Sequence, residues 1–214
     1  MKKLLATIVL SLLLNVNAYA DCIKGDCKNG FGEYKDKHKS IYVGNFKNKK
    51  FHGQGIYTWS DKTEYKGDFK NGLRDGKGIF VIPGGLEFYG NFKNDNYFKG
   101  LMKFTSGNRY EGEFKNGRFH GYGIWTSKAG QQYIGQFENG SRNGNGVLKR
   151  ADGAVYKGNF KNGLIHGKGT YTYPNKEVYS GEFKNGLFHG KGTYTYPNKE
   201  VYSGEFKNGK KIKN

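Results

Sequence analysis

The stretch Tyr179–Glu200, YSGEFKNGLFHGKGTYTYPNKE, determines how most of this chain folds. Side chains alternate between the two faces of a β-strand, so Tyr179, Gly181 and Phe183 would share one face. Asn185 and Gly186 follow directly, and both residue types tolerate a positive φ. The stretch therefore begins as a strand that ends in a tight turn.

The second half of the stretch predicts a returning strand. In GKGTYTY, residues Gly190, Gly192, Tyr194 and Tyr196 would share a face, and PNKE would turn the chain into the next unit. Glycine is a poor strand residue, so its regular use indicates a close approach by another group. We expect each glycine on this face to leave room for an aromatic ring of a neighbouring strand.

This unit recurs along the chain. Its first-strand pattern, Tyr-x-Gly-x-Phe, returns every 23 residues, with one interval of 22, and a variant of it begins with Phe88. The fold class predicted is all-β: an elongated single-sheet array of stacked antiparallel β-hairpins of about 23 residues each. The first-strand tyrosines would form an aromatic ladder along it: Tyr42, Tyr65, Tyr110, Tyr133, Tyr156, Tyr179 and Tyr202.

The combined pattern YxGxFKNGxxHGxGxY resembles the MORN repeat. The resemblance covers about Ile23 to Gly209 and is strongest from Tyr156 onward, where Lys168–Gly186 is identical to Lys191–Gly209. It implies a scaffold or binding module that contacts a protein, forms a homodimer or attaches to phospholipid. Related arrays carry attached catalytic domains, and no such domain accompanies the repeats in this sequence.

The N-terminus predicts export. Residues 1–20 combine two lysines, an apolar run and Ala-Tyr-Ala, which is typical of a signal peptide cleaved after Ala20; an uncleaved anchor is the alternative. The expected organisation is then a capping partial repeat at 21–41, the array at 42–209 with a degenerate repeat at 88–109, and a basic tail at 210–214. The periplasm, the cell surface and the extracellular space all fit this signal.

The net charge of +18 favours an acidic partner. Export argues against nucleic acid, which leaves an unidentified protein, anionic lipid or an acidic polysaccharide. A lysine follows the first-strand aromatic in seven units, where Glu138 is the exception, and stacking would align these lysines in a row that could follow a polyanion. The alternative is a solvated rim that keeps the sheet soluble. The lysines are Lys47, Lys70, Lys93, Lys115, Lys161, Lys184 and Lys207.

The remaining polar residues give no catalytic pattern. Histidine precedes a glycine in four units, but Asp75 and Asn143 take the same place in others. These types share an ability to lock a turn, and histidines in adjacent repeats would lie ~10 Å apart, too far for one zinc. No nucleophile motif or phosphate loop is present. We therefore expect a chain that is not an enzyme, without metal or cofactor, whose rings pack on one another rather than on sugars.

Cys22 and Cys27 lie in CIKGDC, near the start of the exported chain. In an extended strand this spacing would separate the thiols by ~16 Å and place them on opposite faces. The segment is therefore either a strand with two free thiols or a curled cap closed by a disulfide. Export and the even cysteine count favour the disulfide.

Overall fold

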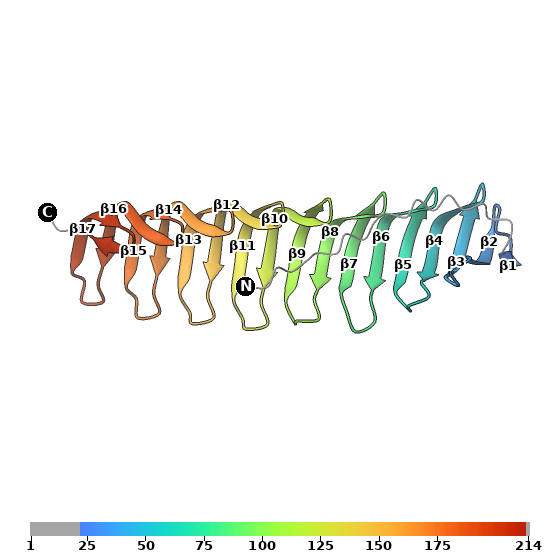
Figure 1. Cartoon of the computed structure of the whole chain (residues 1–214), viewed down its shortest axis with the longest axis horizontal. Helices are drawn as coiled ribbons and strands as arrows, with labels where there is room; N and C mark the ends of the chain where they lie inside the picture. The colour runs from blue at the N-terminus through green and yellow to red at the C-terminus, as the bar shows by residue number, and fades with distance from the viewer. Residues whose placement is uncertain (1–21, 213–214) are drawn as a thin grey trace. The chain divides into compact units, whose positions relative to one another are not determined.

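The computed structural model describes residues 22–212, and the predicted signal at 1–20 lies outside the described residues. The chain divides into two compact units. The first extends to Thr105 and also contains Lys115–Gly117, and the second contains the other residues from Ser106 onward. The described part of the chain has no helix long and apolar enough to cross a membrane. The all-β hairpin architecture predicted above is confirmed (Figure 1).

Each unit is a succession of antiparallel strands, each paired with the strands before and after it in the chain. The first unit holds β1 Cys22–Gly25, β2 Phe31–Lys35, β3 Ile41–Lys47, β4 Lys50–Thr58, β5 Glu64–Lys70, β6 Leu73–Val81, β7 Glu87–Lys93 and β8 Asn96–Lys103. The second holds β9 Arg109–Lys115, β10 Arg118–Thr126, β11 Gln132–Glu138, β12 Ser141–Lys149, β13 Val155–Lys161, β14 Leu164–Thr172, β15 Val178–Lys184, β16 Leu187–Thr195, β17 Val201–Lys207 and β18 Lys210–Lys211.

The tight turns follow from the Lys-Asn-Gly sequence. Between β15 and β16, Asn185 has a φ of 52° and Gly186 a φ of 86°. Two successive positive φ values give a turn whose twist matches that of the strands it joins. The longer connections, such as the PNKE segments, lie at the opposite ends of the strands and join each hairpin to the next (Figure 1).

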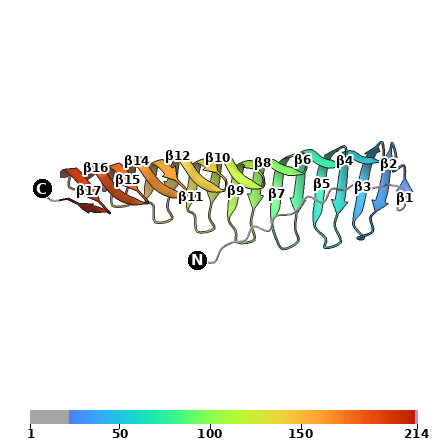
Figure 2. The same ribbon diagram turned by 45° about the horizontal axis from the view of Figure 1, so that its top comes forward.

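A bulge interrupts the second strand of each regular hairpin. In β15–β16, Gly181 pairs with Gly192 and Glu182 pairs with His189, so two residues of β16 have no partner on β15. One of them, Gly190, has a φ of 57°. A bulge bends its strand, and the hairpins curve toward their tight turns (Figure 2). The simple alternation predicted for GKGTYTY therefore begins only after this bulge.

The core is a layer of rings on one face of the strands. The Tyr179 ring is fully buried and lies flat across Gly181 and Gly192, where a Cβ on Gly192 would sit 2.6 Å from ring atoms Cε2 and Cζ. Phe188 stacks on the same ring with centroids 3.8 Å apart. Glycine on two adjacent strands thus provides the flat surface that a tyrosine covers.

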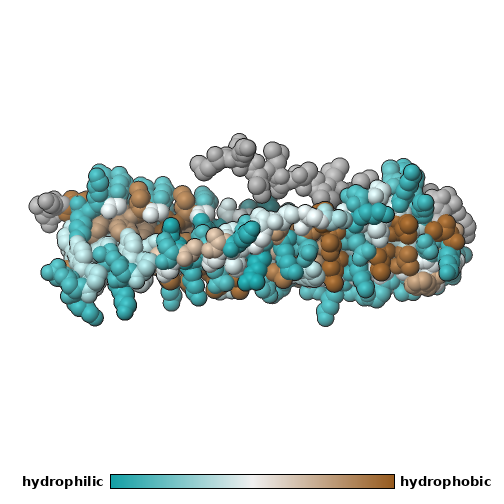
Figure 3. Space-filling model, turned by 90° about the horizontal axis from the view of Figure 1, so that it is seen from below, coloured by the Kyte–Doolittle hydropathy of each residue, from teal (hydrophilic) through white to brown (hydrophobic). Residues whose placement is uncertain are grey.

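These rings also join one repeat to the next. Phe183 contacts Tyr179 of its own strand and Tyr156 of the preceding repeat edge to face, each with centroids 5.0 Å apart. The same two contacts recur in both units, for instance from Phe69 to Tyr65 and Tyr42. The tyrosines of the predicted ladder are fully buried except Tyr202, which is half-buried. Hydrophilic side chains cover much of the surface seen from below, with hydrophobic groups between them (Figure 3).

The degenerate repeat differs in its bulge. In β7–β8, Asn91 pairs with Lys99 and Phe92 with Tyr97, so only one residue is extra, and this accounts for the 22-residue interval. In the regular hairpins the tyrosine hydroxyl donates to a backbone carbonyl at the bulge, as Tyr156 does to Asn159 at 3.0 Å. Phe88 has no hydroxyl. The loss of the hydroxyl and the shortening of the bulge therefore occur together.

Candidate functional site: an open groove and a row of lysines

In two repeats, the side chain at the repeated histidine position contacts the tight turn of the following repeat. Nδ1 of His166 accepts a hydrogen bond from the backbone N–H of Asn185 at 3.5 Å. Asp75, in the same place of an earlier repeat, accepts from the N–H of Asn94 at 3.2 Å. Histidine and aspartate therefore have the same role in these two repeats. In three other histidines Nδ1 is buried and has no hydrogen-bond partner among the described residues: His52, His120 and His189.

Polar side chains of the first strand fill the bulge of their own hairpin. Asp68 accepts a hydrogen bond from the N–H of Lys77, and Gln136 accepts one from the N–H of Asn145, both at 2.8 Å. Glu182 has the same place in its hairpin, and its Oε2 would lie 2.5 Å from a Cβ on Gly190. These side chains therefore support the backbone and leave fewer charged groups for a partner.

The hydroxyls of the ladder tyrosines donate hydrogen bonds to backbone carbonyls. Burial raises the pKa of Tyr133 and that of Tyr156 to about 12. Both remain protonated at neutral pH and keep their hydrogen bonds to backbone carbonyls. Among the residues that the structure describes, no group of three or more histidine, cysteine, aspartate or glutamate side chains could hold a metal ion.

All seven predicted row lysines are exposed and lie at the last position of a first strand. They end β3, β5, β7, β9, β13, β15 and β17, and Glu138 ends β11 in the same place. Within the second unit, Lys161, Lys184 and Lys207 follow one another in three successive hairpins. This arrangement can present positive charge beside the tight turns.

Cys22 and Cys27 form a disulfide, with their Cα atoms 6.0 Å apart. The strand β1 ends at Gly25, whose φ of 79° starts a turn, so the chain curls back and brings Cys27 toward Cys22. The disulfide that the sequence favoured is therefore present, the alternative with two free thiols is wrong, and the short strand β1 occupies only the first four residues of the segment. Cys27 is buried against Gly32 of β2.

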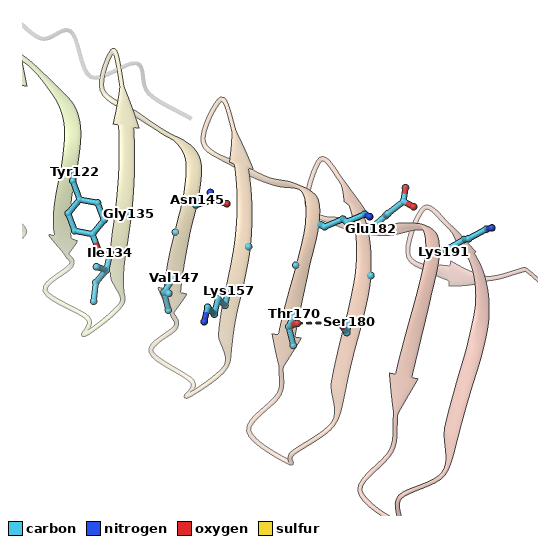
Figure 4. Close-up of a pocket in the computed structure, with 15 residues that line it drawn as sticks. Tyr122, Ile134, Gly135, Asn145, Val147, Lys157, Thr170, Ser180, Glu182 and Lys191 are labelled. Atoms are coloured by element: carbon cyan, nitrogen blue, oxygen red, sulfur yellow. Dashed lines mark hydrogen bonds between the residues drawn. The ribbon is translucent and has the colours of Figure 1, made fainter.

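An open groove crosses seven strands of the second unit, from β10 to β16 (Figure 4). Glycines form its floor, and a Cβ added to them would meet the buried tyrosines of the ladder, so the groove lies on the face opposite that ladder. One wall contains Ile134, Val147, Lys157, Thr170 and Ser180. The other wall contains Tyr122, Asn145, Lys168, Glu182 and Lys191.

The groove changes character along its length. At its β10–β12 end it carries Tyr122, which is 60% exposed, with Ile134 and Val147. At its β14–β16 end it carries Lys168 and Lys191, both exposed. The ion pairs found among the described residues are Arg74–Asp95, Lys103–Glu87 and Arg150–Asp152, and none includes a groove lysine. The groove therefore has an apolar half and a basic half.

Glu182 and Lys191 belong to the groove, and Thr193 lines a smaller adjoining pocket. Sequence reasoning did not assemble Tyr122, Lys157 and Lys168 into one groove. The sequence pointed to the groove through one variable position. The glycine of the second strand is constant, whereas the residue before it differs between repeats: Gln54, Lys77, Tyr122, Asn145, Lys168 or Lys191.

The ring-on-glycine core and the hairpin succession define a β-hairpin repeat protein. The family model for the MORN repeat matches residues 42–64, 65–87, 110–132, 133–155, 156–178, 179–201 and 202–211, and the chain belongs to the MORN repeat family. Within this range the family model leaves 88–109 unmatched, and that segment has the shortened bulge. A comparison with curated proteins found no match.

Among solved structures, the chain is similar to the TCP domain of SAS-4 (dCPAP) from Drosophila melanogaster, in complex with a proline rich motif of Ana2 (dSTIL). The identity is 9%, the TM-score 0.45, and the alignment covers 72% of this chain and 85% of that one. The wild-type TCP10 domain of Danio rerio CPAP is 14% identical with a TM-score of 0.36, and the alignment covers 83% of this chain and 90% of that one.

Proposed function

We propose that this chain is an exported, non-catalytic scaffold that binds another protein through the open groove of its second unit. The observation that carries the proposal is the contrast between the two faces of the strands. On the ring face the same tyrosine, glycine and phenylalanine recur, whereas the groove walls change from repeat to repeat. A surface that varies over a constant framework suits recognition of a particular partner.

The non-catalytic part of the proposal is supported by the way in which the repeated polar groups are used. His166, Asp68 and Gln136 are engaged by backbone N–H groups, and the buried Tyr156 by a carbonyl. A catalytic acid or base needs to reach a substrate. Export is supported by the signal-like residues 1–20 and by the disulfide, which is stable in an oxidising compartment.

A photo-crosslinking amino acid tests the groove directly. Placed at Thr170 in the exporting cell, it should capture a defined protein; the control at Asn175, in the loop after β14, should not. The captured protein is then purified and its binding to the intact chain is measured. Capture of the same proteins at both positions, or of none at Thr170, would contradict the proposal. Fractionation and N-terminal sequencing of the mature chain test export and cleavage after Ala20.

A second candidate function uses the lysine row, because all seven lysines are exposed at equivalent strand ends. The row would bind anionic phospholipid headgroups or an acidic polysaccharide. Such binding should fall steeply as salt rises and should be lost when Lys161, Lys184 and Lys207 are changed to glutamate. Binding to anionic vesicles that survives both changes would argue against it.

A further inference from the structure

The groove of the second unit has enough chemical detail to define its occupant, and the inference rests on the protein-binding function proposed above. We propose that the groove binds an extended segment of a partner protein, about ten residues long, with an apolar side chain at one end and two carboxylates three residues apart at the other.

The length follows from the strands that the groove crosses. From β10 to β16 there are six strand intervals, and at ~4.8 Å per interval the groove extends for roughly 29 Å. A polyproline-type extended chain rises ~3.1 Å per residue, so about ten residues span that distance. The strands bordering the groove are already paired on both sides, so the segment must cross them rather than add to the sheet.

The spacing of the carboxylates follows from the repeat. Lys168 and Lys191 occupy the same position in successive hairpins, two strand intervals or ~9.6 Å apart. Three residues of a polyproline-type helix advance ~9.3 Å and return to the same side of the helix. A segment in that conformation can therefore place a carboxylate on each lysine, whereas a β-strand, whose same-face side chains lie ~6.8 Å apart, cannot.

Charge complementarity favours an acidic segment at this end. Lys157, Lys168 and Lys191 are exposed in the groove. Glu182, opposite Lys168, is turned over Gly190, and Glu205, opposite Lys191, lies in the adjoining pocket. None of the ion pairs among the described residues joins these glutamates to the groove lysines. At the other end, Tyr122 and Ile134 offer apolar surface. The distance from Tyr122 on β10 to Lys168 on β14 is four strand intervals, ~19 Å, which is about six residues of such a segment.

Synthetic peptides test this inference with the full chain. The probe is a proline-rich ten-residue peptide with phenylalanine at position 1 and glutamate at positions 7 and 10, together with its reverse. The matched control has the same composition with the glutamates two residues apart. Fluorescence anisotropy should show the probe or its reverse binding at least about tenfold more tightly than the control. Equal binding, or no binding by either order, would overturn the inference.

Variants locate the site. Reversing charge at Lys168 and Lys191 together should weaken probe binding at least about tenfold, because like charges replace both ion pairs. The same reversal at Lys161 and Lys184, in the lysine row of the same unit, should change binding less than about threefold. An unchanged thermal unfolding curve shows that both double variants fold. Equal losses in the two variants would refute the groove as the site. If the peptides fail but Thr170 still crosslinks a partner, only the sequence pattern inferred for the occupant is wrong; if Thr170 crosslinks nothing, the proposed function fails as well.

Discussion

Replacing Gly169 by alanine should remove the Tyr156 ring from its place in the core. Gly169 lies in β14 between Gly158 and Gly181 of the adjacent strands. A Cβ there would be 2.5 Å from Cε2 and 2.6 Å from Cζ of Tyr156. Carbon atoms in contact prefer ~3.5–4.0 Å, so the ring must withdraw by roughly 1 Å.

The magnitude follows from what the ring then loses. Overpacking of a tight core costs ~1–3 kcal/mol, and the hydrogen bond from the Tyr156 hydroxyl to the Asn159 carbonyl contributes ~1 kcal/mol. Replacing glycine by alanine in a strand recovers ~0.5–1 kcal/mol of chain entropy. The net loss in the free energy of unfolding of the hairpin should be about 2 kcal/mol. The edge-to-face contact with Phe183 at 5.0 Å should loosen too.

Urea unfolding, with native-state hydrogen exchange of the β13 and β14 amides, measures this loss. The control is Gly163→Ala: a Cβ there meets no atom within 4 Å, and the φ of 84° alone should cost about 1 kcal/mol. The decisive step is the double mutant. In a Tyr156→Leu background the ring is absent, so Gly169→Ala should change the free energy of unfolding little. If it costs as much there as in the wild type, the ring is not the reason for the glycine, and the reasoning is refuted.

Three further predictions concern the same framework. Tyr156→Phe should destabilise its hairpin by about 1 kcal/mol in urea unfolding, because the hydrogen bond to Asn159 is lost. Phe88→Tyr should give no gain in stability, because the bulge of its hairpin is shorter. A gain in stability would contradict the link between the hydroxyl and the bulge. Because burial raises the pKa of Tyr133 and that of Tyr156 to about 12 from about 10 in the unfolded chain, the stability they contribute is complete below pH 10 and should fall between pH 10 and 12. Tyrosinate absorbance and circular dichroism should therefore change together, and ionisation without unfolding would oppose this. Asp95 has a φ of 65°, and its carboxylate lies 3.2 Å from the Arg74 guanidinium. Arg74→Met should therefore lower the free energy of unfolding by about 1 kcal/mol. The loss should be smaller in an Asp95→Gly background, where no carboxylate is left unpaired.

The sequence predicted the features that depend on local chemistry. Period-two alternation located the strands, and Asn185-Gly186 located a turn with positive φ values. The bulge was not predicted, because Gly190 fits a regular strand as readily as a left-handed position. Its conformation is supported by groups distant in the chain, including the Tyr179 hydroxyl, which donates to the Glu182 carbonyl at 2.9 Å.

The groove could not be predicted for a related reason. Its residues come from seven strands, and only the registers of the hairpins decide which side chains become neighbours. Lys168 and Lys191 have the same place in their repeats, so a correct register could have paired them. Tyr122 gave a weaker signal, since an aromatic residue in a Tyr-rich chain is expected in the core rather than 60% exposed.

The edge-to-face contact between a phenylalanine and the tyrosine of the preceding hairpin has an evolutionary consequence. Phe183 and Phe206 make the same contact on either side of one complete repeat. A tandem insertion of 23 residues would therefore create only contacts that already exist, and the nearly identical last repeats are consistent with such an event. Each insertion would lengthen the groove by ~9.6 Å, enough for three more residues of an extended ligand. A gene that gains or loses whole repeats would then change the length of the ligand segment that the groove can bind, without any change in how the core packs.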